Sequence, residues 1–173
     1  MSSHSLQPYP PVPFDGNKIN SEKELSGFIK ELKEIPLLIE SATAHLSDLQ
    51  LDKKTEKGVW TIRQVVHHIA DSHMHAFMRF KFALTEESPV IKPYPESLWA
   101  ELPDTLQSSV DHSLAILKGV HGRWTDTLSK LSLEDLQKTY YHPDDKAYVK
   151  LALQIPMYVW HGKYHLGFIV RAL

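Results

Sequence analysis

Apolar residues recur at helical spacing over long stretches of this chain, and the alternation of apolar and polar residues that indicates a half-buried strand is absent. Two of the stretches open with a capping box, in which Ser21 and Thr61 are each followed three residues later by Glu or Gln. A third stretch begins at Asp104, and the last begins at Leu151. The sequence therefore predicts an all-α fold in which four main helices surround one core.

Prolines and breaks in the apolar pattern predict where these helices end or bend. Pro36 should break or kink the first helix, whose apolar pattern then continues into a charged stretch. The second helix is expected to end near Thr85 and the third near Leu131. Pro156 should kink the last helix or lie in its first turn, and residues 140–146 are predicted to form a loop before it.

Two proline-rich segments lie outside the predicted helices. Residues 1–20 should form an extended arm that precedes a single domain at residues 21–173. This arm is either poorly ordered or lies across the domain or a neighbouring subunit. The connection at residues 88–100 carries Tyr94 and Trp99, which either wall a pocket or seal the end of the bundle.

Composition narrows the functions that are open to the chain. With 173 residues it is expected to form one domain with a core of its own. The absence of cysteine excludes disulfides, cysteine-ligated metal sites and a thiol nucleophile. The net charge of -2 includes no basic block, which argues against a nucleic-acid partner, and no stretch suggests an export signal or a membrane anchor. We therefore expect a cytoplasmic protein whose partners are small molecules or other copies of itself.

Histidine is unusually frequent, with 11 residues in the chain, and four of them lie between positions 67 and 75. In the last predicted helix His161 and His165 are four residues apart, so their rings share one face and are able to chelate a metal ion. Such pairs are also common without a metal, when one ring bonds to a carbonyl or water and the other is solvated. Because Gly162 stands where the motif H-E-x-x-H has Glu, the zinc-protease motif is absent and a third ligand must come from elsewhere.

The second predicted helix offers that third ligand on two neighbouring faces. His68, Ser72 and His75 share one face with Val65, and the other face, about 100° away, carries His67, Asp71 and Met74. Helical spacing alone does not choose between these two faces.

Five segments of the chain resemble the DinB-like superfamily, and within it the YfiT branch, which includes bacillithiol S-transferases and proteins described as metal-dependent hydrolases. They read WTIRQVVHHIADSH (60–73), RFKFALT (79–85), PYPESLWAELPD (93–104), ILKGVHGRW (116–124) and WHGKYHLGFI (160–169). The resemblance implies an antiparallel four-helix bundle that binds one divalent metal ion per subunit and forms a homodimer.

The resemblance also implies which histidines bind the metal. The positions that match the family's ligands are His68, His161 and His165. His67 then packs or supports a ligand, whereas His75, where the branch has asparagine, enlarges the polar face or adds a ligand. Three neutral nitrogens leave at least one position open on the ion, which points to chemistry on bound water or substrate. Zn²⁺ is the expected ion and Ni²⁺ the alternative, because imidazole suits both.

Three functions follow from such a site. The first is a hydrolase that activates water, with Asp71 or Glu101 as general base, although lone carboxylates are more often caps or surface charges. The second is an S-transferase that presents the thiolate of a low-molecular-weight thiol cosubstrate to an electrophile. The third is a stress-response module that binds a metal without catalysis.

Substrate contacts are predicted for residues near the histidines and in the proline-rich connection. The candidates are Arg79, His75, Tyr94 and Trp99. A thiol that carries carboxylates would also need cations, for which the candidates are Arg79, Lys81, Arg123 and Lys163. For each of these cations taken singly, a solvated surface charge is the favoured interpretation.

Overall fold

Four long helices make up most of the structure, a computed structural model that describes residues 13–55 and 60–173. They are α1 (Glu22–Thr43), α3 (Ile62–Thr85), α6 (Val110–Leu128) and α7 (Leu151–Ala172). The shorter elements are α2 (Asp48–Leu51), α4 (Glu96–Trp99), α5 (Pro103–Gln107), the 3₁₀ helix η1 (Asp135–Gln137) and the strands β1 (Thr139–His142) and β2 (Ala147–Lys150). The predicted four-helix bundle is confirmed.

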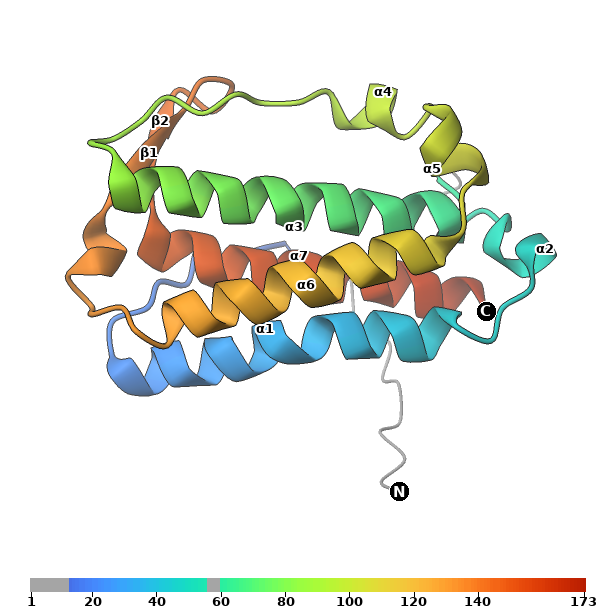
Figure 1. Cartoon of the computed structure of the whole chain (residues 1–173), viewed down its shortest axis with the longest axis horizontal. Helices are drawn as coiled ribbons and strands as arrows, with labels where there is room; N and C mark the ends of the chain where they lie inside the picture. The colour runs from blue at the N-terminus through green and yellow to red at the C-terminus, as the bar shows by residue number, and fades with distance from the viewer. Residues whose placement is uncertain (1–12, 56–59) are drawn as a thin grey trace.

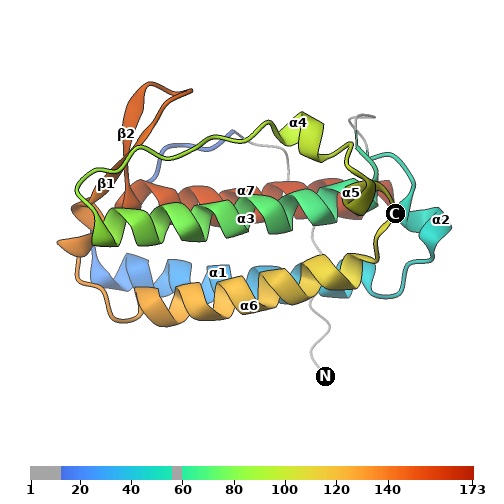
Figure 2. The ribbon, with the colours of Figure 1, turned by 45° about the horizontal axis from the view of Figure 1, so that its top comes forward.

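The four long helices form a ring in which α1 and α3 each pack against both α6 and α7. Figure 1 shows α1 and α7 running in one direction and α3 and α6 in the other, so the α1–α6 and α3–α7 pairs are antiparallel. This order arises because the connection at residues 86–109 runs back over the outer side of α3 and starts α6 at the end where α3 began (Figures 1 and 2). As a result α3 and α7, which are far apart in the sequence, lie side by side.

Side-chain caps fix the starts of the first two long helices. The Thr61 capping box is complete, because the Thr61 hydroxyl accepts from the backbone N–H of Gln64 and the Gln64 side chain accepts from the Thr61 N–H at 2.9 Å. The Ser21 hydroxyl accepts from the N–H of Glu24, but the Glu24 carboxylate accepts from the N–H of Asn20. Both helix starts are therefore encoded by local sequence.

The third long helix starts later than predicted. Asp104 lies in the separate helix α5, and Ser108 and Ser109 have extended backbone with ψ of 157° and 135°. The Ser109 hydroxyl then caps α6, which ends at Leu128. The prediction of one continuous helix from Asp104 to Leu131 is wrong because two extended residues interrupt it without interrupting its apolar spacing.

Prolines inside two long helices free a carbonyl without ending the helix. Pro36 lies within α1, which continues to Thr43, so the predicted break is wrong; Pro156 lies within α7. Because proline has no N–H, the carbonyl four residues before it lacks its helical donor. The carbonyl of Ala152, four residues before Pro156, accepts instead from the N–H of Ile19 at 3.1 Å. The proline in α7 thereby provides an attachment point for the segment before α1.

The described part of the predicted arm, residues 13–20, lies against the bundle. The side chain of Ile19 is 2% exposed, and the Phe14 ring lies 6.0 Å from that of Trp160 on α7. For these residues the structure supports an arm that lies across the domain. Residues 1–12, which hold the other prolines of the arm, are outside the described residues.

A short hairpin replaces the loop predicted before α7. Strands β1 and β2 are antiparallel, with Thr139 opposite Lys150 and His142 opposite Ala147. Each strand has only four residues, too few for alternation to be recognised in the sequence. The largest fully buried side chains include Trp124 of α6, Phe80 of α3 and Tyr140 of this hairpin, so the hairpin contributes to the core.

Within the described residues, no helix combines the length and the apolar character needed to cross a bilayer.

Candidate metal centre

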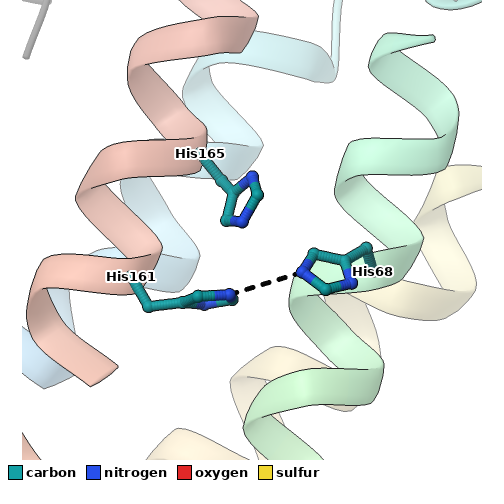
Figure 3. A group of neighbouring side chains, drawn as sticks. All are labelled: His68, His161 and His165. Carbon is teal, nitrogen blue, oxygen red and sulfur yellow. Dashed lines mark hydrogen bonds between the residues drawn. The ribbon is translucent and has the colours of Figure 1, made fainter. Parts of the chain in front are cut away.

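Three imidazole rings meet between α3 and α7 (Figure 3). His68 projects from α3 toward His161 and His165, which project from successive turns of α7. The Nε2 atoms of His68 and His161 lie 3.3 Å apart, and ring nitrogens of all three residues lie within 4.8 Å of one another. The structure therefore brings together the three histidines that the resemblance implies.

The spacing between the Nε2 atoms of His68 and His161 fits two bonds to one tetrahedral metal ion. Two zinc–nitrogen bonds of about 2.0–2.1 Å at a tetrahedral angle hold their nitrogens about 3.3–3.4 Å apart. The two Nε2 atoms of His68 and His161 stand at 3.3 Å. Three nitrogen donors also leave one tetrahedral position for another ligand. The side chains present thus suit a zinc-type ion in an open site.

Burial keeps rings of this group in the neutral form that binds metals. It lowers the pKa of His68 to about 4. Burial, followed by the neighbouring His165, also lowers the pKa of His161 well below its ordinary value. As whole residues, His161 and His165 are partly exposed, whereas His68 is buried.

His73 supports this group from the interior of the bundle, a role that sequence reasoning missed. The ring is fully buried, with its Nε2 3.2 Å from Nδ1 of His161 and its Nδ1 2.8 Å from Nε2 of His121 on α6. The four histidines between positions 67 and 75 were the available signal. Helical spacing does not reveal that His73 faces a histidine of another helix.

The other two histidines of this cluster on α3 have separate partners. His67 Nδ1 lies 2.7 Å from the Ser113 hydroxyl on α6, so its role is packing between α3 and α6. His75 stacks on Tyr94 with ring centroids 4.2 Å apart. The convergent group of three metal-binding side chains found among the described residues does not include His75, so this group gives no support for His75 as a further ligand.

The two carboxylates considered as general bases differ in their surroundings. Asp71 is half-buried on α3, and burial, followed by the charge of Asp104, raises its pKa to about 6. Glu101 is exposed in the connection before α5. Neither carboxylate belongs to the convergent group of histidines.

A cavity of about 340 Å³ opens beside α3 and joins the four residues predicted to contact a substrate. Its lining includes His75, Arg79, Tyr94 and Trp99. His75 is seven residues from His68, which is about 10 Å along the helix. The rings of Tyr94 and Trp99 lie 4.8 Å apart at the cavity wall. Their position favours the pocket wall over a seal at the end of the bundle.

Arg79 carries a buried charge in the wall of this cavity. The residue is 9% exposed, its Nε has no hydrogen-bond partner, and no carboxylate among the described residues forms an ion pair with it. The phenols of Tyr140 and Tyr158 are hydrogen-bonded to the Arg79 side chain, but they do not balance its charge, because burial raises the pKa of both and keeps them neutral. A buried cation without a counter-ion is costly, so this position favours binding of an anionic group.

The other three predicted cations lie elsewhere. Lys81 and Arg123 lie over the Phe77 ring, 5.3 and 5.6 Å from its centroid, and Lys163 pairs with Glu31. None of them lines the cavity with Tyr94, whereas Lys92, which sequence reasoning did not single out, does so.

Comparison with known proteins agrees with this geometry. The sequence pattern of the DinB superfamily matches residues 31–169. The chain belongs to the DinB superfamily. Two relatives, from Bacillus cereus (strain AH820) and Bacillus anthracis (strain A0248), bear the name putative metal-dependent hydrolase. Each is 45% identical over 161 residues, which cover 93% of this chain and 92% of the relative.

A solved structure gives the same result for the fold. YfiT from Bacillus subtilis, described as a probable metal-dependent hydrolase with an unusual four-helix bundle topology, superimposes with a TM-score of 0.91. It is 39% identical, and the match covers 95% of this chain and 94% of YfiT. The chain is thus a DinB superfamily protein of the YfiT type whose three-histidine cluster fits a metal site.

Proposed function

We propose that this protein is a metal-dependent hydrolase that binds one divalent ion, Zn²⁺ in preference to Ni²⁺, through His68, His161 and His165. The observation that carries the proposal is the convergence of three ring nitrogens from α3 and α7 within 4.8 Å. The names of the relatives from Bacillus cereus and Bacillus subtilis support the same class of reaction.

The bound ion would polarise the scissile group and lower the pKa of water from about 15.7 toward 7. The three histidines would hold the ion through their ring nitrogens, and two of these residues are partly exposed. Asp71 is the better candidate for the general base, because its pKa of about 6 allows it to be ionised near neutral pH and to return a proton to the leaving group. Glu101 is exposed in the connection before α5 and offers no comparable buried setting.

The cavity beside α3 supports a substrate with an anionic group. Arg79 would bind a carboxylate or phosphate, while Tyr94 and Trp99 contact the body of the molecule. The same cavity would suit a low-molecular-weight thiol that carries carboxylates, so the S-transferase remains the second candidate.

Turnover by the zinc-loaded full chain tests the proposal. A panel of carboxylate- and phosphate-bearing esters and amides, with and without an added thiol, should yield hydrolysis that needs only water. His161→Ala should reduce turnover at least 100-fold because a ligand is lost, while His45→Ala, at an exposed histidine beyond α1, should have no effect.

Consumption of an electrophile only when thiol is present would contradict the hydrolase and favour the S-transferase. Turnover that survives His161→Ala would contradict both enzymes, and a folded, metal-binding chain without any turnover would favour the non-catalytic module.

The substrate class is tested in the same assay. Arg79→Gln should raise the KM for an anionic substrate about tenfold or more, with little change for a neutral analogue of the same shape. Lys92→Gln, at an exposed residue of the same cavity, is the matched control and should change KM much less. Equal effects of Arg79→Gln on both substrates would contradict an anion-binding role.

A further inference from the structure

A row of three histidine rings connects the candidate metal ligand His161 to the backbone of α1. His161 Nδ1 lies 3.2 Å from His73 Nε2, and His73 Nδ1 lies 2.8 Å from His121 Nε2. His121 Nδ1 lies 2.5 Å from the carbonyl oxygen of Leu32. The row therefore crosses the bundle from α7 through α3 and α6 to α1. His73 and His121 are 0% and 1% exposed, so water does not replace any of these contacts.

The carbonyl at the end of the row is available because of Pro36. In a regular helix the Leu32 carbonyl would accept from the N–H of residue 36, but proline has none. The ring of His121 supplies the missing donor. A carbonyl oxygen only accepts hydrogen bonds, so the proton of His121 must be on Nδ1.

This one fixed proton determines the protons of the other two rings. Neutral His121 with its proton on Nδ1 presents a lone pair at Nε2, so His73 must donate from its own Nδ1. His73 then presents a lone pair at Nε2, and His161 must donate from Nδ1. The opposite order would place the lone pair of His121 Nδ1 against the Leu32 oxygen at 2.5 Å. A charged ring in the row is disfavoured because no carboxylate among the described residues pairs with His73 or His121.

We infer that His73 and His121 are positioning residues that hold His161 in the Nδ1–H tautomer, with the lone pair of Nε2 directed at the metal. The Nε2 of His161 is indeed the atom that faces His68, at 3.3 Å. In the other tautomer this nitrogen would carry a proton and could not bind an ion. The hydrogen bond made by the second ring nitrogen of a ligand histidine sets which nitrogen binds the metal. For His161 this bond goes to His73, which is held by His121, and His121 is held by the carbonyl that Pro36 leaves free. This role in metal binding rests on the proposed function. The placement of the protons on Nδ1 of His73, His121 and His161 does not depend on it.

Nitrogen NMR of the full chain labelled with ¹⁵N-histidine tests the order of protons directly, because protonated and unprotonated ring nitrogens differ widely in chemical shift. The spectra are recorded near neutral pH without metal and after loading with Zn²⁺. His73, His121 and His161 should each show a proton on Nδ1 and none on Nε2 in the metal-free chain, and this pattern should persist in the loaded chain. A proton on Nε2 of any of the three, or a mixture of tautomers at His161, would overturn the inference.

Variants test whether the row matters for the ligand. His121→Phe removes both the bond to Leu32 and the acceptor for His73, so His161 should become a mixture of tautomers and Zn²⁺ should bind about 10- to 100-fold more weakly. His67→Phe is the matched control, since His67 is also a buried histidine between α3 and α6 but lies outside the row. It should leave the His161 tautomer and Zn²⁺ affinity unchanged.

The outcomes separate the inference from the proposed function. An unchanged His161 tautomer and affinity in folded His121→Phe would overturn the positioning role. If that variant does not fold, Pro36→Ala provides the test. The alanine returns a backbone N–H that competes for the Leu32 carbonyl, so the signal of the His121 Nδ1 proton should shift. An unshifted signal would overturn the role of the freed carbonyl. Nδ1–H tautomers in a chain that binds no Zn²⁺ would support the proton order while contradicting the metal-dependent function.

Discussion

At the level of a single residue, the proposed role of Asp71 as general base and the burial of its carboxyl group have opposite consequences. Its raised pKa suits a general base, but the same burial makes its charge costly to the fold. The native chain binds a proton at Asp71 more tightly than the unfolded chain does, so stability falls as pH rises from 3.8, the ordinary value, through about 6. Activity and stability should therefore change in opposite directions when this carboxylate is removed.

Asp71→Asn should stabilise the metal-free chain by about 1–2 kcal/mol at pH 8 and by much less at pH 4, where the native carboxyl is already protonated. Urea unfolding of wild type and variant at the two pH values measures this difference. Glu101→Gln, which changes an exposed carboxylate, should stay within about 0.5 kcal/mol of wild type at both. A stabilisation by Asp71→Asn that is equal at pH 4 and pH 8 would show that charge burial is not its cause.

Single residues also show where sequence reasoning stops. The pair His161 and His165 follows from helical spacing, but spacing left His67 and His68 equally open, and only the family resemblance separated them. In the structure the choice depends on which neighbour each ring faces, α6 for His67 and α7 for His68. The contact between His73 and His121 joins residues 48 positions apart and leaves no local signal.

At the level of helices, Gly162 allows α7 to approach α1 beside the candidate ligand His161. A Cβ at this position would lie 2.9 Å from two side-chain atoms of Ile35, which is 1% exposed. Ile35 is enclosed by the core and has little room to move. Gly162, which occupies the position of Glu in the motif H-E-x-x-H, therefore has a packing role.

Gly162→Ala should destabilise the chain by about 1–2 kcal/mol, because the clash exceeds the gain in helix propensity. Gly122→Ala in α6 is the matched control: its Cβ meets nothing within 4 Å, so it should stabilise by about 0.5–1 kcal/mol. Denaturant unfolding compares the two. Stabilisation of similar size in both variants would contradict the close contact between α7 and α1.

Local signals predict helices well where they include a cap, as at Ser21 and Thr61. They fail where the chain changes direction without changing its apolar spacing, as at Ser108 and Ser109 between α5 and α6. The break predicted at Pro36 fails for a different reason. The carbonyl of Leu32, which Pro36 leaves without its helical donor, accepts a hydrogen bond from the ring of His121 on another helix. Helix propensity does not include such tertiary partners.

At the scale of the whole molecule, the long connection over α3 determines which helices meet. It makes α6 parallel to α3 and leaves α7 antiparallel to it (Figures 1 and 2). The candidate ligands on α3 and α7 converge, while His121 of α6 contacts His73 of α3. The presence of four long helices follows from the sequence, whereas their arrangement does not follow from periodicity. The homodimer that the family resemblance implies stays a prediction.

Anomalous X-ray scattering at the zinc edge from crystals of the zinc-loaded full chain tests the metal centre most directly. We expect one strong peak per chain, about 2.0–2.1 Å from ring nitrogens of His68, His161 and His165, with Nε2 as the donor atom of His161 and a further position open to solvent. A zinc peak bound by other side chains, or no peak between α3 and α7 in fully loaded protein, would contradict the account.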